Sequence, residues 1–200
     1  MTTHNESHHK MLDQSKIVQA ALEVLQLEGY KSITIRKVAE KLGIKSASLY
    51  WHIKNKKELL ELVADEICKD IQFPEEKENW DEQLRQLANQ WRDQLLSIKD
   101  AAVVLSETAP TTPYRIQLIE RLHQIFINAG MNKENAFSSL WLYNVYITSF
   151  ILEEYRFLGI SKETPHSSTP THLTIPDMEK EFQFGLDTML MGLKEKIKKD

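Results

Sequence analysis

Residues 34–53 read TIRKVAEKLGIKSASLYWHI, and this stretch decides the fold of the first part of the chain. Thr34 favours the start of a helix, and Gly43 breaks that helix and allows a tight turn. A second short helix is predicted from about Ser46 to Ile53. Two short helices joined by a glycine-containing turn form a helix-turn-helix. The small core of this motif is predicted to contain Val38, Leu42, Ile44 and Leu49.

The residues left on the outside of the second helix suit contact with DNA. They are Lys45, Ser46, Ala47, Ser48, Tyr50, Trp51 and His52. Small side chains at a helix start let the helix enter a major groove, where its backbone N–H groups also meet phosphates. An ordinary surface helix pair is the plainer interpretation. Two neighbouring exposed aromatic residues, Tyr50 and Trp51, are costly on a mere surface, so DNA contact is favoured.

Charge is distributed unevenly along the chain. The whole sequence has 25 Lys and Arg against 29 Asp and Glu, a net charge of −4. Residues 31–57 contain eight Lys and Arg and a single acid, Glu40, so this window has a net charge of +7 while the remainder has −11. A basic patch inside an acidic chain indicates a polyanionic partner.

Composition excludes several other classes of protein. The chain has 200 residues and six glycines, no two of them spaced G-x-G, which excludes a Rossmann fingerprint and a P-loop. G-x-S-x-G and H-E-x-x-H are also absent from the sequence. Cys68 is the single cysteine, so no internal disulfide and no cysteine-based zinc site are expected. No apolar run resembles a signal peptide or a membrane span, so we expect a cytoplasmic protein without a membrane partner.

The rest of the chain has helical periodicity, which predicts an all-α fold. The first helix begins after Asp13, an N-cap residue, and ends before Gly29. Asn55 predicts the cap of a helix from about 56 to 71. Further helices are predicted at about 80–98, 100–108, 115–129, 133–158 and 177–198. The segment 159–176 is rich in proline, serine and threonine and is predicted to be a flexible connection.

These patterns divide the chain into four predicted regions. They are a disordered arm at 1–11, a helix-turn-helix DNA-binding domain at 12–54, a connecting helix at 55–73 and an effector-binding and dimerisation domain at 74–200. His4, His8 and His9 lie in the arm, where a loose chain end does not fix the geometry of a metal site. We expect no metal and no cofactor.

Residues 12–67 resemble the DNA-binding domain of the tetracycline-repressor (TetR) family, most closely in TIRK at 34–37 and LYWHIKNK at 49–56. The resemblance implies that Arg36 reaches a base edge, since an Arg forked onto guanine is the commonest specific contact. It implies that Lys45, Ser46, Ala47 and Ser48 face bases and that Tyr50, Trp51, His52 and Lys56 hold phosphates. Thr34 completes the candidate DNA-binding set. Lys45, Ser46 and Ala47 depart from the residues typical of the tetracycline operator reader.

The remainder of the chain is similar in layout to the tetracycline repressors, which implies a domain that senses a small molecule. Pockets for such molecules are mostly apolar with few polar groups. The candidate effector-binding residues are Leu87, Gln90, Trp91, Leu105, His123, Phe126, Trp141 and Tyr146. An ordinary helix-bundle core is the plainer interpretation for most of them. Leu105 stands where the resemblance implies a histidine that helps hold drug-bound magnesium, so no tetracycline–Mg²⁺ site of that kind is predicted.

Two helices of each subunit are predicted to form the interface of a homodimer. The segment 133–158 is apolar nearly all round, so it must be buried on more than one side. In the last helix, Gly185 and Gly192 are seven residues apart and permit close helix approach. These two helices from each subunit are predicted to form a four-helix bundle.

The resulting hypothesis is a repressor that a small, largely apolar molecule releases from a palindromic double-stranded operator. A protein of the same fold that acts architecturally, or through a protein partner without an effector, is one alternative, and a sealed core would favour it. A tetracycline–Mg²⁺ sensor is a second, against which Leu105 argues. An all-α enzyme is a third, but the sequence offers no defensible set of catalytic residues.

Overall fold

The computed structural model describes residues 12–75, 79–163 and 176–198, and the predicted arm at 1–11 lies outside them. In the described ranges the fold is all-α, as predicted. The elements are α1 (Gln14–Glu28), a 3₁₀ turn η1 (Tyr30–Ser32), α2 (Ile35–Lys41), α3 (Ser46–Leu49), α4 (Lys56–Cys68), α5 (Trp80–Ser97), α6 (Ala101–Ser106), α7 (Pro113–Asn128), α8 (Lys133–Glu163) and α9 (Met178–Ile197).

Side-chain caps begin the helices of the first part where the sequence predicts them. Asp13 accepts a hydrogen bond from the backbone N–H of Lys16 at 2.9 Å. The Thr34 hydroxyl and the Asn55 amide oxygen do the same for α2 and α4, at 3.1 and 2.9 Å. Each cap satisfies a donor that the first helical turn leaves unpaired. Gly43 adopts a φ of 70°, a left-handed conformation that suits glycine, so the tight turn between α2 and α3 is confirmed.

Helix α3 is shorter than predicted, because it ends at Leu49 rather than at Ile53. The chain continues in turns, with the N–H groups of His52 and Ile53 donating to the Leu49 carbonyl at 2.9 Å each. Asn55 then adopts an extended backbone and caps α4. The recognition element is therefore one helical turn followed by an irregular aromatic turn.

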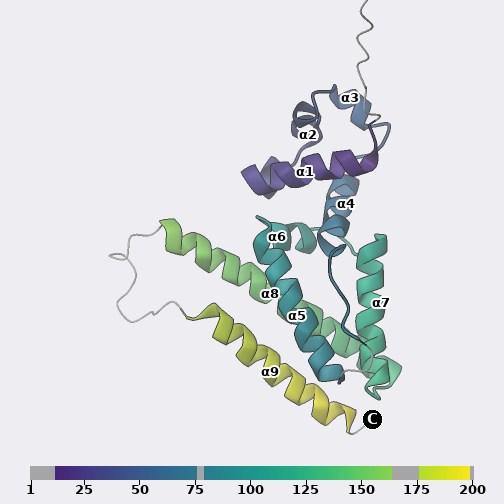
Figure 1. Ribbon diagram of the computed structural model, residues 1–200, viewed down its shortest axis with the longest axis vertical. Coiled ribbons are helices and arrows are strands. Elements are labelled where there is room, and N and C mark those ends of the chain that lie inside the picture. Colours follow the sequence, from purple (N-terminus) through teal and green to yellow (C-terminus); the bar gives the residue numbers. More distant parts are fainter. Residues whose placement is uncertain (1–11, 76–78, 164–175, 199–200) are drawn as a thin grey trace, which may run out of the picture.

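Residues 12–54 form a small unit, here called the head, which lies at the top of Figure 1. Helix α4 descends from the head into a larger bundle of α5 to α8, here called the sensor, and α9 lies along one side of it (Figure 1). Apolar side chains from both units form a continuous core, which includes Ile17, Leu49, Leu59 and Leu84, each 0% exposed. The head is thus packed onto the sensor as well as joined to it by α4.

Helix α8 is longer than predicted, because it passes through Gly159 and reaches Glu163. Glycine costs only about 1 kcal/mol relative to alanine in a helix, and the next proline is Pro165. The prediction of a flexible connection is therefore wrong for residues 159–163, and residues 164–175 lie outside the described residues. None of the described helices combines the length and the apolar character that a membrane crossing requires.

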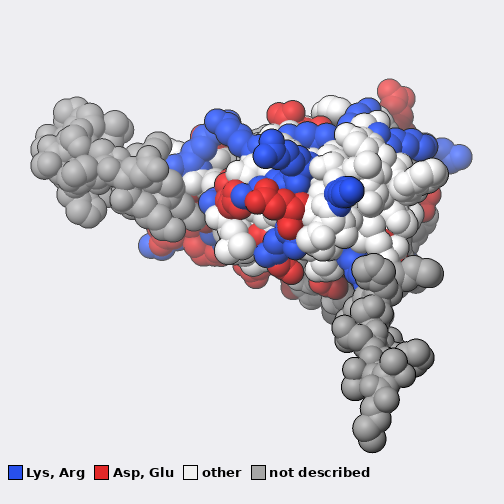
Figure 2. Space-filling model, turned by 90° about the horizontal axis from the view of Figure 1, so that it is seen from above, with Lys and Arg blue, Asp and Glu red and all other residues white. Residues whose placement is uncertain are grey.

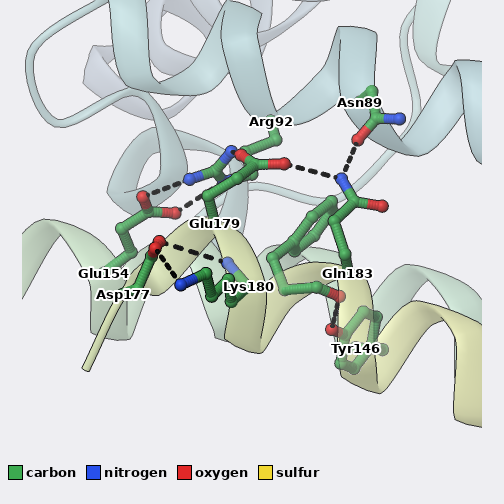
Figure 3. A network of polar contacts seen from close by, with 9 residues as sticks. Asn89, Arg92, Tyr146, Glu154, Asp177, Glu179, Lys180 and Gln183 are labelled. Atoms are coloured by element: carbon green, nitrogen blue, oxygen red, sulfur yellow. Dashed lines mark hydrogen bonds and ion pairs between the residues drawn. The ribbon is translucent and has the colours of Figure 1, made fainter.

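A buried polar network fixes α9 against α5 and α8 (Figure 3). The Arg92 guanidinium on α5 donates to both carboxylate oxygens of Glu154 on α8, at 2.8 and 2.6 Å, and also pairs with Glu179 on α9. The hydrogen bond with Glu154 is the main cause that raises the pKa of Arg92. Next to it, Gln183 donates to Asn89 at 2.7 Å. The bidentate pair gives the contact between α5 and α8 a defined geometry, and Glu179 attaches α9 to the same guanidinium.

Gly185 permits the predicted close helix approach, and within one subunit this approach is between α9 and α8. The Tyr146 ring lies directly over it, and an added Cβ would come within 2.8 Å of Cε2 of that ring. The Tyr146 hydroxyl donates to the Phe182 carbonyl at 2.6 Å, one turn before Gly185 (Figure 3). Gly192, in contrast, has nothing within 4 Å of its added Cβ in the described chain.

Candidate nucleic-acid interface and effector cavity

The turn after α3 exposes the aromatic residues that were predicted to contact DNA. Tyr50 is 56% exposed and Trp51 is 88% exposed. Lys45 and Ala47 are also exposed, while Ser46, Ser48 and His52 are half-buried. Large aromatic side chains of this exposure are unusual on a free surface. They lie beside the one-turn helix that begins with small residues, as the sequence predicts for a groove-binding element.

The structure divides the basic window into paired and unpaired cations. Lys37 forms an ion pair with Glu28 at 2.9 Å, and Lys41 with Glu23 at 2.6 Å, both across to α1. The hydrogen bond that Lys37 donates to Glu28 raises the pKa of Lys37. These α1 partners lie before the window, so its net charge overstates the positive charge available to DNA.

Five of the remaining cations of the basic window are better placed for a polyanion. Lys31, Arg36, Lys45 and Lys54 are exposed and have no acid within 4.0 Å among the described residues. The ammonium group of Lys56 lies 5.5 Å from the centre of the Tyr30 ring, a cation–π contact that leaves its charge uncompensated. Figure 2 looks down on the molecule from the side of the head and shows Lys and Arg side chains gathered around a smaller acidic patch. Thr34, also predicted to bind DNA, is exposed, and its hydroxyl caps α2.

A cavity of about 500 Å³ lies in the sensor among α5, α6, α7 and α8. It has the size of pockets that hold drug-sized molecules. Of the eight predicted effector-binding residues, Trp91, Leu105 and Trp141 line it. The other lining residues are Ser106, Thr108, Pro110, Arg115, Leu118, Ile119, Leu122, Phe137, Leu140, Asn144 and Thr148. The sealed core that would have favoured a protein without an effector is not what the sensor contains.

The other five predicted residues lie outside this lining. Leu87 and Phe126 are core residues, 1% and 0% exposed, and the Phe126 ring packs edge-on against Tyr143. Gln90 accepts a hydrogen bond from the backbone of Gln72 at 3.1 Å. His123 is half-buried on another part of α7, and Tyr146 is bonded to α9. Periodicity places these residues on inner helix faces but does not say which inner faces surround a void.

Arg115 and Thr108 are cavity residues that the sequence prediction missed. Arg115 stands three and seven positions before Leu118 and Leu122, so the three share one face of α7. That spacing was a usable signal. Burial lowers the pKa of Arg115, since its charge is partly removed from water. The Arg115 guanidinium donates to the Thr108 hydroxyl at 2.7 Å and to the Ala109 carbonyl at 3.0 Å.

The rim of the cavity continues into an exposed apolar surface. Phe137 and Trp141 line the cavity and are nevertheless 61% and 67% exposed. The same helix also exposes Leu142 and Val145, and α9 exposes Phe184 and Met191 at 71% and 63%. Helices α8 and α9 thus present large apolar side chains that nothing in the described chain covers.

The cavity lining contains neither histidine nor a carboxylate. Leu105, at the position where the resemblance implies a metal-ligating histidine, is one of its walls. Among the described residues no group of three or more His, Cys, Asp and Glu could hold a metal ion. The donor set of this cavity is therefore unlike that of a magnesium–drug site.

Comparison with known proteins gives matches over nearly the whole chain. Residues 17–63 match the model of bacterial regulatory proteins of the tetR family, and residues 73–197 match the tetracyclin repressor-like C-terminal domain. Tetracycline repressor protein class G from Vibrio anguillarum is 29% identical over 196 residues, which cover 90% of this chain and 93% of that protein.

Two solved structures extend the comparison to the fold. ActR from Streptomyces coelicolor in complex with (S)-DNPA has a TM-score of 0.80 at 29% identity, covering 94% of this chain and 99% of ActR. BioQ with its natural double-stranded DNA operator has a TM-score of 0.77 at 26% identity, covering 92% of this chain and 99% of BioQ. One relative is thus seen with a small molecule and another with duplex DNA.

Proposed function

Because the chain belongs to the TetR family of bacterial regulatory proteins and is a ligand-responsive DNA-binding transcriptional regulator, we propose that it represses transcription as a homodimer. In this proposal residues 12–54 form the domain that reads the operator, and residues 55–73 form the helix that connects it to the rest of the chain. Residues 74–200 form the domain that binds the effector and makes the dimer contact. We propose no enzymatic activity and no metal cofactor. The operator is a pseudo-palindrome, because a two-fold dimer presents the same reading surface twice, about 34–36 Å apart.

In the proposed complex, Arg36 reads a base edge and residues 45–48 lie in the major groove. Tyr50, Trp51, His52 and Lys56 hold phosphates and fix the register of the head on the duplex. The observation that carries this assignment is the exposure of Tyr50 and Trp51 next to cations without acidic partners. The BioQ–operator structure, at a TM-score of 0.77, supports duplex DNA as the ligand of the head.

The proposed dimer contact is made by α8 and α9 of both subunits. Large apolar side chains such as Trp141 and Phe184 would lose most of their exposed area there, and burial of apolar area contributes about 25 cal/mol per Å². Trp141→Asp and Phe184→Asp are expected to give monomers in sedimentation experiments, with Lys198→Asp, an exposed change near the end of α9, as the control. Monomers should bind a palindromic operator far more weakly than the dimer.

Control by the effector is proposed to work through the cavity. A molecule bound among α5 to α8 shifts α4 and thereby the head, which favours the state that does not fit the operator. A ligand can do this only if it binds the two states with different affinity. The ActR complex with (S)-DNPA supports the sensor as the place of binding.

The test is the selection of duplexes from a random library by the purified protein, followed by titration of the selected duplex at fixed salt. A palindromic consensus with two half-sites supports the proposal, and Arg36→Ala should relax the base preference at one position of each half-site. Equal affinity for all duplexes, or affinity that does not change with salt, would overturn it. The same titration with tetracycline and Mg²⁺ tests the alternative effector, and no release of the operator is expected.

A further inference from the structure

From the chemistry of the cavity, and on the basis of the proposed function, we infer the class of the effector and the residue that senses it. The cavity takes a largely aromatic ligand with an anionic oxygen, such as a carboxylate or a phenolate. Arg115 on α7 binds that oxygen, and the resulting movement of α7 is transmitted to α4 through Asp65. No divalent metal takes part.

The lining of the cavity has one charged side chain, and it is a cation. Trp91, Phe137 and Trp141 supply aromatic surface, while Arg115 is the only ionisable group among the lining residues. The indole Nε1 of Trp91 is buried and has no hydrogen-bond partner among the described residues. A buried donor without an acceptor is unfavourable, and an acceptor oxygen of a ligand that reaches this indole N–H would satisfy it.

The present partners of Arg115 are neutral, and a ligand anion would replace them favourably. Its Nη1 donates to the hydroxyl and carbonyl of Thr108 and to the carbonyl of Ala109, and Nη2 donates to the carbonyl of Leu105 at 3.3 Å. No carboxylate in the described chain lies within 4.0 Å of this guanidinium. A guanidinium and an anionic oxygen form short, often bidentate hydrogen bonds with an added attraction between opposite charges, which the neutral oxygens of the present partners do not supply.

The acids that face Arg115 from α4 are Glu61 and Asp65, with the Cys68 thiol between the helices. Asp65 is 8% exposed, and its carboxylate accepts from the backbone N–H groups of Tyr114 and Arg115, at 2.8 and 3.1 Å. Those groups belong to the first turn of α7. The carboxylate is thus occupied by the helix end and does not neutralise the guanidinium directly.

Asp65 therefore caps α7 from another helix. The residue at the local cap position, Thr112, leaves its hydroxyl buried and without a partner among the described residues. Because α4 leads directly to the head, a ligand that draws Arg115 away from the end of α6 also moves the first turn of α7 and, through Asp65, α4. Arg115 is the sensing residue in this scheme, and Asp65 is a positioning residue.

The test uses two probes of the same shape that differ in charge, anthraquinone-2-carboxylate and anthraquinone-2-carboxamide. Binding to the full-length dimer is followed by tryptophan fluorescence at constant ionic strength, with and without EDTA. We expect the carboxylate to bind at least tenfold more tightly than the carboxamide, and EDTA to have no effect. Arg115→Gln should abolish the preference for the anion, Arg115→Lys should keep part of it, and Thr148→Val, a change in the same lining, should preserve it.

Asp65 is tested by a second readout, the release of the operator. Asp65→Ala should bind the carboxylate within threefold of the wild type and yet release the operator at least tenfold less, while Asp65→Asn retains an acceptor and should rescue release. Circular dichroism confirms that each variant is folded. Equal binding of the two probes, no binding of either, or an unchanged preference in Arg115→Gln would overturn the inference. If the wild type does not bind operator without probe, the proposed function fails instead.

Discussion

Asp100 joins the sensor to the head, and its substitution should loosen that joint. It is the only non-glycine residue among the described ones with a positive φ, 55°, and it stands at the start of α6. Its Oδ2 accepts a hydrogen bond at 2.8 Å from the backbone N–H of Tyr30, which lies just beyond α1 in the head. The approach is close because the neighbouring residue is Gly29, where an added Cβ would lie 2.6 Å from the same oxygen.

Three substitutions separate the two contributions of this residue. Asp100→Asn keeps an acceptor and tolerates the left-handed backbone, so it should lower the free energy of unfolding by less than about 1 kcal/mol. Asp100→Gly relieves the backbone but leaves the partly buried Tyr30 N–H without its acceptor, which costs about 1–3 kcal/mol. Asp100→Ala loses the acceptor and adds the left-handed cost of about 1–2 kcal/mol, so it should be the least stable.

Urea unfolding followed by tryptophan fluorescence measures these differences, with Asp93→Ala, an exposed acid on α5, as the control for loss of charge. The operator affinity of the glycine and alanine variants should fall as well, since the head is held less firmly. If the glycine variant is as stable as the asparagine variant, which keeps the acceptor, the hydrogen bond to Tyr30 does not stabilise the contact between head and sensor. If the alanine and glycine variants are equally stable, the left-handed backbone is not a constraint.

Three further outcomes follow from the observed contacts. Lys56→Ala removes two phosphate contacts from a dimer, so the slope of the logarithm of the operator-binding constant against the logarithm of the salt concentration should fall by about 1.8. Lys41 is paired with Glu23, so Lys41→Ala should change this slope little in the same titration. Glu154→Gln weakens the buried pair with Arg92, which keeps its second partner Glu179, and should lower the free energy of unfolding by about 1–3 kcal/mol. Glu153→Gln at an exposed pair should cost less than about 1 kcal/mol, and equal unfolding curves would contradict this. Burial raises the pKa of the Cys68 thiol to about 12, so iodoacetamide at pH 8 should label it in urea and not in the native protein, as mass spectrometry will show.

The head could be predicted from the sequence because its rules are local. A cap such as Asp13 or Asn55 bonds to a backbone group three residues away, and the glycine turn at Gly43 depends on its own φ. The outward position of Tyr50 and Trp51 likewise follows from which residues of a short motif are apolar enough to form its core. Each of these relations involves residues that lie within ten positions of one another in the sequence.

The cavity and the effective charge of the head depend on relations between distant helices. Lys37 and Lys41 are less available to DNA because they form ion pairs with acids of α1. A count of charge along the chain does not reveal these pairs. Leu87 and Phe126 lie on inner faces as predicted, yet the rotation of each helix turns them into the core and brings Arg115 to the cavity. Periodicity gives the inner face of a helix but not the partner of that face.

Helix α6 is held at both ends, at its start to the head and at its end to α7. Asp100 holds the start of α6 to the head, and Arg115 holds its end through the carbonyls of Leu105, Thr108 and Ala109. A helix of six residues has little cooperativity of its own, so it is ordered chiefly by what holds its ends. The cavity touches the end that Arg115 holds, and a ligand that competes for this guanidinium therefore removes one of the two supports. The contact that remains, at Asp100, is the one with the head. A displacement of α6 would therefore move the head directly, in addition to the movement that α4 transmits.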